Sequence, residues 1–448
     1  MYKTLDAPLS THLEITTGCN QQCSHCYNFW RSEKPKLNMN LDEKTALRIV
    51  EQLAVLRVFH VILTGGEPLI NLEVLLFVMK ELSKRGITFS LNSNLALLNE
   101  KIARELKKAG LNTVLASLLS YDMETHDFLS NTRGSFKRVI RGINIAKMSG
   151  LKIGVNMVVS KINLPYVKKT GEFVNSLGVF AFSATRVMEP RSKPNNFSND
   201  LLLDNQEVQM IVDQMLALKK TGLQLNSLVP YPTCFFKDDK ALALLGKRTC
   251  SAGKTSSAIA SDGTVRACPH HEVVYGSIIN EDFSSIWEKM SQWRDGSLIP
   301  EPCRICSFFP RCGGGCRIAS SDENLCGKDK IMKSEEDVPL NFIKHLPNSS
   351  VITENTLLRV KFTCRFRKDM AMGIINTGGI RNTFVSHDTL LLFEKLGAEK
   401  AVFTPQVVRE KYGILMDQHE YLNFFGELII RGVLERVGGK EANHGTRV

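Results

Sequence analysis

Three cysteines near the start of the chain have a spacing that suits an iron–sulfur cluster. Cys19, Cys23 and Cys26 lie in the run CNQQCSHC, directly after the apolar stretch LEITT, which predicts a first strand. Three thiolates can each hold one iron of a cubane and leave the fourth iron free to bind a small molecule. A zinc site stays open as the alternative, but zinc needs a fourth ligand, for which His25 is badly placed.

Nine further cysteines follow late in the chain, and seven of them follow the order CX12GX4C, CX2CX5CX3C and a single C. The nine are Cys234, Cys250, Cys268, Cys303, Cys306, Cys312, Cys316, Cys326 and Cys364. A disulfide framework is not expected in so long a chain without a secretory signal at its start. The pattern therefore indicates metal ligands.

Length and charge limit the class of protein. The 448 residues allow two to four domains, and no apolar run reaches membrane-spanning length, so we expect a soluble, cytoplasmic protein. The formal net charge of +11 counts every thiol as neutral. Eleven thiolates around three clusters would lower it to about +6. Basicity is therefore weak evidence for nucleic acid, and it fits an acidic peptide or an acidic electron donor equally well.

The first two hundred residues alternate strand-length apolar runs with amphipathic helical stretches. Predicted strands cover 12–17, 61–66, 87–92, 113–118, 152–159 and 181–186, and predicted helices cover 41–56, 71–86, 99–110, 135–150 and 164–178. Glycine follows several helices as a C-cap, at Gly86, Gly110, Gly150 and Gly178. Right-handed crossovers then build a parallel sheet, and six units make a partial TIM-like barrel with its ligand site at the carboxyl ends of the strands.

Later segments differ in composition. An amphipathic helix is predicted near 204–221, whereas 249–330 is rich in Gly and Cys with little helical period, which predicts a core of metal rather than hydrocarbon. After a polar linker, three short strands (361–369, 373–379, 381–386) and three helices (387–397, 403–413, 417–437) are expected. The predicted divisions are 1–195, 196–248, 249–330, 331–348, 349–440 and a tail at 441–448.

Together these motifs resemble the radical S-adenosylmethionine (SAM) enzymes that carry the seven-cysteine SPASM extension, over roughly residues 10 to 330. The last hundred residues resemble the winged-helix-like peptide-recognition domain of the pyrroloquinoline quinone pathway. The implied fold class is α/β: a partial (β/α)6 TIM-like barrel, an iron–sulfur SPASM domain and a small winged-helix-like α+β domain.

The resemblance implies S-adenosylmethionine bound at the open iron, and one electron then yields a 5′-deoxyadenosyl radical. The segment after the second strand suits the methionine end of this cofactor, because paired glycines allow close backbone approach and a carboxylate suits its ammonium group. Its residues are Thr64, Gly65, Gly66, Glu67 and Pro68. Tyr27 is implied beside the adenine. Asn92, Ser117 and Asn156 either hold ribose and carboxylate or cap strand ends.

Some positions depart from the family pattern. The usual acidic residue after the fourth strand is replaced by Leu119, and Ser130 and Asn131 stand where relatives have an Arg-Gly pair. Arg133 or Arg138 is a substitute for the missing arginine.

The late cysteines are implied to hold two auxiliary clusters, which makes three [4Fe–4S] clusters in all. The family's interleaved pattern assigns Cys303, Cys306, Cys312 and Cys326 to the outer cluster and Cys250, Cys268 and Cys316 to the inner one. Cys234 either completes the inner cluster or is a buried free thiol. The triplet Gly313–Gly315 lets the backbone turn tightly near sulfide. Cys364 is expected to be an inert strand residue.

One position bears on the reaction. The sulfatase-maturing branch has an acidic residue after the second SPASM cysteine, whereas Pro269 follows Cys268 here. His270 and His271 are candidate bases or a solvated loop pair.

These features favour a maturase that binds a ribosomally made precursor peptide through its C-terminal domain, by strand addition, and abstracts a hydrogen from it. A carbon–carbon or carbon–sulfur cross-link is the expected product, with a flavodoxin or ferredoxin as the electron donor. One alternative is an enzyme that modifies a tetrapyrrole or another small metabolite. Another is a non-enzymatic iron–sulfur regulator that binds DNA, although the C-terminal helices are mixed or apolar rather than basic.

Overall fold

The structure is a computed structural model that describes residues 4–28, 30, 39–190, 197–333 and 352–437. The chain divides into two compact units, Met1–Leu340 and Asn341–Val448, and the division falls inside the predicted linker. Within the described part of the chain, none of the helices combines the length and apolar character needed to span a bilayer.

A ten-stranded sheet forms the centre of the first unit, in the order β10-β9-β8-β1-β2-β3-β4-β5-β6-β7. Neighbours from β8 through β1 to β7 pair in parallel, and β9 and β10 pair antiparallel. The first seven strands are β1 Ser10–Glu14, β2 His60–Thr64, β3 Thr88–Ser93, β4 Thr113–Ser117, β5 Lys152–Val159, β6 Ala181–Arg186 and β7 Gln224–Asn226. The six predicted strands are thus present, and β7 adds one.

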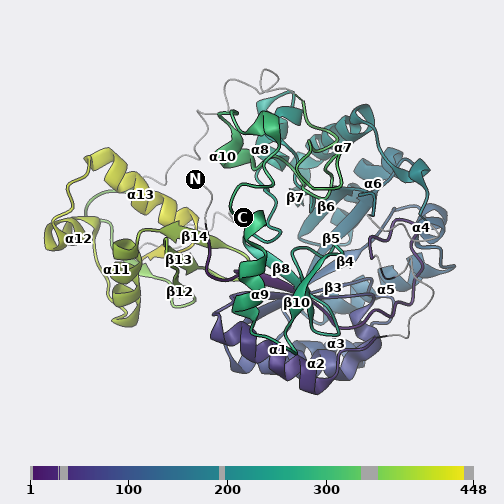
Figure 1. The fold of residues 1–448 in the computed structure, drawn as a ribbon, viewed down its shortest axis with the longest axis horizontal. Helices are drawn as coiled ribbons and strands as arrows, with labels where there is room; N and C mark the ends of the chain where they lie inside the picture. Colours follow the sequence, from purple (N-terminus) through teal and green to yellow (C-terminus); the bar gives the residue numbers. More distant parts are fainter. Residues whose placement is uncertain (1–3, 29, 31–38, 191–196, 334–351, 438–448) are drawn as a thin grey trace. The chain divides into compact units, whose positions relative to one another are not determined.

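Helices follow the strands and lie around the outer side of the sheet (Figure 1). They are α1 Glu43–Val55, α2 Leu72–Lys84, α3 Glu100–Lys108, α4 Met123–Ser130, α5 Ser135–Met148, α6 Val167–Ser176, α7 Asn205–Ala217 and α8 Asp239–Leu245. Asp42 and Asn99 cap α1 and α3 by accepting from backbone N–H groups. Gly86, Gly110, Gly150 and Gly178 all have positive φ, which confirms their predicted place after helices. Sequence reasoning missed the short α4.

The two faces of the sheet differ in polarity because side chains alternate along each strand. Leu13, Leu63, Leu91, Ala116 and Val155 are fully buried on the face toward the helices. The opposite face, here called the inner face, carries polar side chains at positions in register across the strands. Its members are Glu14, Thr64, Asn92, Ser117 and Asn156. The inner face is therefore suited to bind a polar molecule.

The cysteine-rich region belongs to the same sheet. Its strands are β8 Ser256–Ile259, β9 Thr264–Arg266 and β10 Val274–Ser277, and they are followed by α9 Phe283–Lys289. The prediction of a core held by metal rather than hydrocarbon is wrong, because the side chains of Phe283, Ile286 and Trp287 are fully buried here. The Trp287 indole N–H also donates to the Leu5 carbonyl at 2.8 Å. Burial of these side chains therefore gives the region a hydrocarbon core.

The second unit has its own hydrophobic core. A three-stranded antiparallel sheet, β12-β13-β14, and a pair of strands, β11 and β15, surround it together with three helices. Their bounds are β11 Leu358–Val360, β12 Arg365–Lys368, β13 Gly373–Asn376, β14 Asn382–Val385, α11 His387–Ala398, α12 Pro405–Tyr412, α13 Gln418–Ile430 and β15 Leu434–Arg436. The three predicted strands and three helices are confirmed.

The last predicted helix was too long. It was expected to run to residue 437, but α13 ends at Ile430, and Gly432 at φ +76° turns the chain into β15. Glycine adopts this left-handed conformation without a steric penalty. Strand β15 then pairs with β11, a long-range contact that the local pattern does not reveal.

Truncation of Phe393 tests the independence of the second core. Phe393 is fully buried in α11, so Phe393→Ala should lower the unfolding free energy of this unit by about 3–5 kcal/mol. Leu391→Ala, at an exposed position of the same helix, should change it by less than about 0.5 kcal/mol. Urea unfolding, monitored by amide hydrogen exchange within each unit, measures the change in unfolding free energy for both variants. If Phe393→Ala lowered the hydrogen-exchange protection of the first unit as much as that of the second, the two units would not have separate cores.

Candidate active site

The cysteine loop after β1 is held by backbone contacts with the glycine pair after β2. Gly66 N–H donates to the Thr16 carbonyl at 2.7 Å, and Glu67 N–H donates to the Gly18 carbonyl at 2.8 Å. A Cβ on Gly65 would overlap the Thr16 carbonyl oxygen, and one on Gly66 would overlap that of Gly18. Both glycines are therefore required for the close approach of two backbones, beyond any role toward a cofactor.

Helix α4 supports the other side of the cysteine loop. Gln22 N–H donates to the Ser130 carbonyl at 3.1 Å, and Ser24 N–H donates to the Leu129 carbonyl at 3.0 Å. The position where relatives carry an Arg-Gly pair thus contacts the loop through backbone groups. Asn131 ends α4 in the left-handed conformation, at φ +45°.

Arg133 and Arg138, the two residues expected to replace the missing arginine, are exposed or bound elsewhere. Arg138 donates to the Arg133 carbonyl at 3.1 Å, and the Arg133 side chain is exposed. Leu119 is buried against Leu129 and Leu201. None of these three residues belongs to the set that defines the inner face.

Glu67 is bound within the protein. Its carboxylate is fully buried and accepts from the Ser93 hydroxyl at 2.7 Å, Asn94 N–H at 2.8 Å and Leu69 N–H at 3.1 Å. Burial raises the pKa of Glu67, and these hydrogen bonds oppose the rise. The side chain therefore joins the ends of β2 and β3, and Pro68 begins the short helix Pro68–Asn71.

Other predicted cofactor residues lie together on the inner face. Ser117 and Asn156 are register partners on β4 and β5, and Asn156 Oδ1 accepts from the Thr185 hydroxyl at 2.7 Å. Thr64 and Asn92 occupy the same face on β2 and β3. The register thus brings together side chains that are up to 92 residues apart in the sequence.

Tyr27 stacks on a histidine from the cysteine-rich region. The rings of Tyr27 and His270 are parallel within 13°, with centroids 3.8 Å apart. Burial raises the pKa of Tyr27 above its usual range, and Glu14, Cys26 and Cys268 add to this. Tyr27 therefore lies between the first cysteine triplet and the second SPASM cysteine.

The two candidate bases are not a solvated loop pair, so that alternative is wrong. Burial lowers the pKa of His270 to about 4, which leaves its imidazole neutral at neutral pH. His271 is buried and packs edge-on against Trp293, with centroids 5.3 Å apart. His270 contacts a predicted cofactor residue, Tyr27.

Sequence reasoning missed a buried ion pair on the inner face. Glu14 on β1 pairs with Arg266 on β9, and both side chains are almost completely buried. Burial raises the pKa of Glu14 to about 6, and Arg266 opposes the rise. His12, two residues earlier on the same face, is half-buried, and desolvation lowers its pKa to about 4. The alternation HLEI in the predicted first strand was the available signal.

The donors and acceptors present fit the implied cofactors. Three thiols in one loop suit three irons of a cubane. Among the described residues, no three His, Cys, Asp or Glu side chains are placed to share a single metal ion. Glu14 Oε2 and Asn28 Oδ1 are buried acceptors without a hydrogen-bond partner in the described part of the chain, and Asn28 Nδ2 donates to the Gly65 carbonyl at 3.2 Å. Such acceptors suit an ammonium or hydroxyl group of a ligand.

The late cysteines form two groups. Burial raises the pKa of Cys268, with further contributions from Cys250 and Cys316, so these three thiols are neighbours. Burial likewise raises the pKa of Cys303 to about 12, with contributions from Cys312, Cys306 and Cys234. We call the first set the inner group and Cys303, Cys306 and Cys312 the outer group.

Three glycines separate the groups. Gly313, Gly314 and Gly315 have φ values of +68°, +75° and +73°. This run of left-handed residues turns the chain, so Cys312 and Cys316, four residues apart, join different groups. Cys316 N–H donates to Asp329 Oδ2 at 2.9 Å, and Asp329 also pairs with buried Arg186 at 2.7 Å.

Two cysteines lie differently from expectation. Cys234, expected to complete the inner group or stay free, has Cys312 and Cys306 of the outer group as its charged neighbours. Cys364 lies just before β12 rather than within a strand, and its thiol donates to the Val433 carbonyl at 3.5 Å.

Comparison with known proteins decides the family. Residues 13–174 match the radical SAM superfamily, and residues 250–307 match the SPASM iron–sulfur cluster-binding domain. The chain is a radical SAM enzyme with a SPASM domain. It is therefore an enzyme that uses S-adenosylmethionine and iron–sulfur clusters, rather than a non-enzymatic regulator.

Relatives of this radical SAM enzyme differ in substrate. An AdoMet-dependent heme synthase of Methanosarcina barkeri is 26% identical over 330 residues, covering 71% of this chain and 93% of the relative. A PqqA peptide cyclase of Granulibacter bethesdensis is 24% identical over 326 residues, covering 70% and 83%. The structure of Streptococcus suis SuiB bound to precursor peptide SuiA has a TM-score of 0.58 at 17% identity, covering 73% and 76%, and shows the shared fold.

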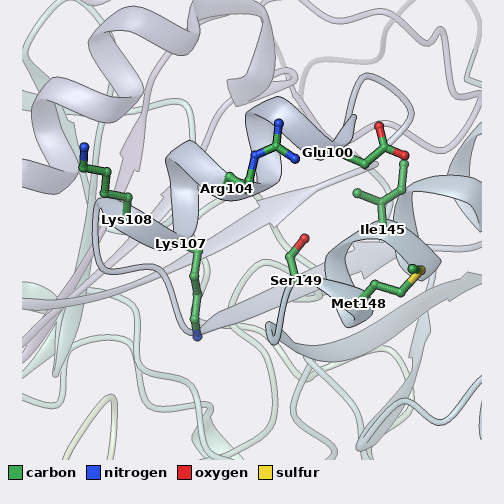
Figure 2. Close-up of a pocket in the computed structure, with 7 residues that line it drawn as sticks. All are labelled: Glu100, Arg104, Lys107, Lys108, Ile145, Met148 and Ser149. Carbon is green, nitrogen blue, oxygen red and sulfur yellow. The ribbon is translucent and has the colours of Figure 1, made fainter.

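A surface pocket of the enzyme lies apart from this site. Figure 2 shows its lining from α3 and the end of α5: Glu100, Arg104, Lys107, Lys108, Ile145, Met148 and Ser149. None of these residues is a cysteine or lies on the inner face.

Substitution of Gly66 tests the backbone contact. Gly66→Ala should displace the cysteine loop and remove the first cluster, a loss of about four iron atoms per chain, because a Cβ overlaps the Gly18 carbonyl. Gly154→Ala in β5 is the matched control, since its Cβ would lie 3.4 Å from Leu115 at ordinary contact. Iron analysis and SAM binding measure the effect, and normal iron in Gly66→Ala would refute it.

Removal of Glu14 tests the buried ion pair. Glu14→Ala leaves the Arg266 charge buried without its partner and should cost about 3–5 kcal/mol of unfolding free energy. Glu100→Ala, at an exposed helix start, should change it by less than about 0.5 kcal/mol. Urea midpoints compare the two. The double change Glu14→Leu with Arg266→Met should recover much of the loss, and equal destabilisation by the single and double changes would contradict a coupled pair.

Proposed function

We propose that the enzyme is a maturase of a ribosomally made precursor peptide and that it installs an oxidative cross-link, carbon to carbon or carbon to sulfur. The observation that carries this proposal is the second unit, a small antiparallel sheet with three helices that follows the SPASM region. A radical SAM enzyme acting on a small metabolite has no evident need for such a unit. A peptide cyclase among the relatives supports the same substrate class.

In this proposal the second unit binds the leader segment of the precursor. Among the described residues, β12 and β14 are the edge strands of its sheet. An extended peptide can add to such an edge through backbone hydrogen bonds, with little dependence on its sequence. Helix α11 packs against β11, β12 and β13, which favours β14 as the edge that receives the peptide. Tethering the leader then raises the local concentration of the core peptide.

The first unit provides the chemistry. When bound, the first cluster and S-adenosylmethionine supply a 5′-deoxyadenosyl radical that abstracts a hydrogen atom from the peptide. Cys19, Cys23 and Cys26 hold that cluster, and the loop from Thr64 to Glu67 keeps their loop in place. Asn92, Ser117 and Asn156, which share one face of the sheet, would orient the cofactor together with Tyr27.

The remaining cysteines hold two auxiliary clusters in this proposal, giving three [4Fe–4S] clusters in all. Clusters bound there would supply an acceptor for the electron that an oxidised product must lose after hydrogen abstraction. A flavodoxin or ferredoxin of the cytoplasm supplies the reducing electron. His270, stacked on Tyr27, is the candidate base for the proton that the substrate must lose.

Tetrapyrrole modification is the second candidate, and the match to a heme synthase favours it. The two candidates make different demands on the second unit. Only a peptide substrate should contact β14.

The test uses the full-length, anaerobically reconstituted enzyme with reductant, SAM and small peptides encoded beside its gene. We expect 5′-deoxyadenosine and a peptide product lighter by two hydrogens for each cross-link, detected by mass spectrometry. The triple variant Cys19→Ala, Cys23→Ala and Cys26→Ala should abolish both products, whereas Cys364→Ala, a cysteine outside every group, should leave both unchanged.

Hydrogen exchange separates the candidates. A precursor peptide should slow amide exchange within Asn382–Val385 of β14, and its leader alone should do the same. Turnover of a tetrapyrrole without any peptide, together with unchanged exchange in β14, would reject the maturase in favour of the second candidate.

A further inference from the structure

A buried ion pair joins the end of β6 to the segment that follows the cysteine-rich motif. Arg186 is the last residue of β6, and its Nη2 lies 2.7 Å from Asp329 Oδ2. The side chain of Asp329 is fully buried, and that of Arg186 is 6% exposed. Replacing such a pair by well-packed apolar residues often leaves a protein at least as stable, so stability alone is a weak reason for two charges here.

Asp329 also holds the backbone of a cysteine of the inner group. The oxygen that pairs with Arg186, Asp329 Oδ2, accepts from the Cys316 N–H at 2.9 Å. A Cβ on Gly315 would lie 2.7 Å from the same oxygen, so the carboxylate fills the space beside the last residue of the glycine turn. Both charges of the ion pair therefore lie next to the Cys316 backbone.

The direction of the Cys316 N–H matters for a cluster bound through this cysteine. Reduction potentials of iron–sulfur clusters depend on nearby charge and on hydrogen bonds to their sulfur atoms. In this structure the Cys316 N–H is directed to a carboxylate rather than to sulfur. A negative charge beside a cluster opposes the gain of an electron, and a positive charge favours it. Burial strengthens both effects, because water does not screen them.

The segment around Asp329 is also held by backbone contacts. The Lys330 N–H donates to the Ala319 carbonyl at 3.1 Å, and the Met332 N–H donates to the Asp329 carbonyl at 2.8 Å. Neither bond uses the Asp329 carboxylate, so both remain when its charge is removed. Lys330 forms a further ion pair with Glu189 at 2.6 Å, in which the lysine side chain is 54% exposed. This surface pair provides a matched control in the same segment.

We propose that Asp329 and Arg186 are positioning residues for the inner auxiliary cluster: Asp329 fixes the backbone of Cys316, and the two opposite charges set the reduction potential of the cluster. The Asp329 charge lowers this potential, and the Arg186 charge raises it. A strand of the radical SAM barrel thereby controls how readily the inner cluster accepts an electron. The inference rests on the proposed function, because that proposal binds a cluster at the inner group.

The experiment measures reduction potentials in a chain that lacks the first cluster. The background carries Cys19→Ala, Cys23→Ala and Cys26→Ala, so that only auxiliary clusters remain, with about eight iron atoms per chain. Redox titrations followed by electron paramagnetic resonance give the potential of each cluster. The altered spectrum of Cys250→Ser, a change in the inner group, identifies the signal of the inner cluster.

Three variants are added to this background. They are Asp329→Asn, the double variant Asp329→Asn with Arg186→Gln, and the control Glu189→Gln. Asparagine removes the charge of Asp329 but keeps an oxygen that can accept from the Cys316 N–H. Iron content and circular dichroism are recorded for each variant, so that loss of the cluster or of the fold is seen directly.

The single and double variants should differ. Asp329→Asn should raise the potential of the inner cluster, because the Arg186 charge, which an arginine does not lose, is then unopposed. At a fixed applied potential, the ratio of reduced to oxidised inner cluster should rise about tenfold. The double variant should return close to the background, since both charges are gone. Glu189→Gln should leave the potential unchanged, because water screens its charge.

A purely structural role predicts the opposite order, since the double variant would then be disturbed at least as much as the single one. An unshifted potential in Asp329→Asn, or equal shifts in the single and double variants, would overturn this inference while the auxiliary clusters stand. A background without iron would overturn the proposed auxiliary clusters and this inference together. If Asp329→Asn loses iron, the double variant decides: recovered iron supports the coupled charges, and loss in both variants overturns them.

Discussion

The contact between two backbones at the carboxyl ends of β1 and β2 determines how the rest of the site is arranged. The N–H groups of Gly66 and Glu67 donate to the carbonyls of Thr16 and Gly18. The two backbones are so close that neither Gly65 nor Gly66 has room for a side chain. The loop that carries Cys19, Cys23 and Cys26 is thereby held at the edge of the sheet where parallel strands present their polar ends. Together with the hydrogen bonds from Gln22 and Ser24 to α4, this contact fixes the position of the three thiols relative to the inner face.

The sheet brings the cysteine-rich region to the same place. Strand β8 pairs with β1, so β9 and its Arg266 lie next to Glu14 on the inner face, and His270 reaches Tyr27. A buried ion pair contributes little net stability when intact, but it is costly to break, because one charge is then left unpaired. It therefore favours one placement of the SPASM strands over others. The hydrophobic side chains around Trp287 support this placement without metal.

Local patterns predicted most elements because their physical causes are local. Apolar patterns and glycines after helices gave the six strands and five helices of the barrel nearly at their observed bounds. The errors arose where distant contacts decide. Residues 434–436 look helical alone, but they pair with β11 as strand β15. His270 and His271 look like a polar loop, yet packing against Tyr27 and Trp293 buries them. The sequence predicts that the Glu67 carboxylate binds a ligand, whereas in the structure this carboxylate accepts hydrogen bonds from the Ser93 hydroxyl and the Asn94 N–H.

The sequence by itself determined the chemistry, because the spacing of Cys19, Cys23 and Cys26 lies within eight residues and sets how three thiolates can share one cluster. It also favoured metal ligands over disulfides for the later cysteines. Only the tertiary structure decided which of those thiols are neighbours. Cys312 and Cys316 are four residues apart and separate, while Cys234 and Cys312 are 78 apart and meet. Distance along the sequence reveals neither arrangement. The turn of three left-handed glycines separates Cys312 from Cys316, whereas a hydrogen bond from the Thr233 N–H holds the remote Cys234 segment against Cys312.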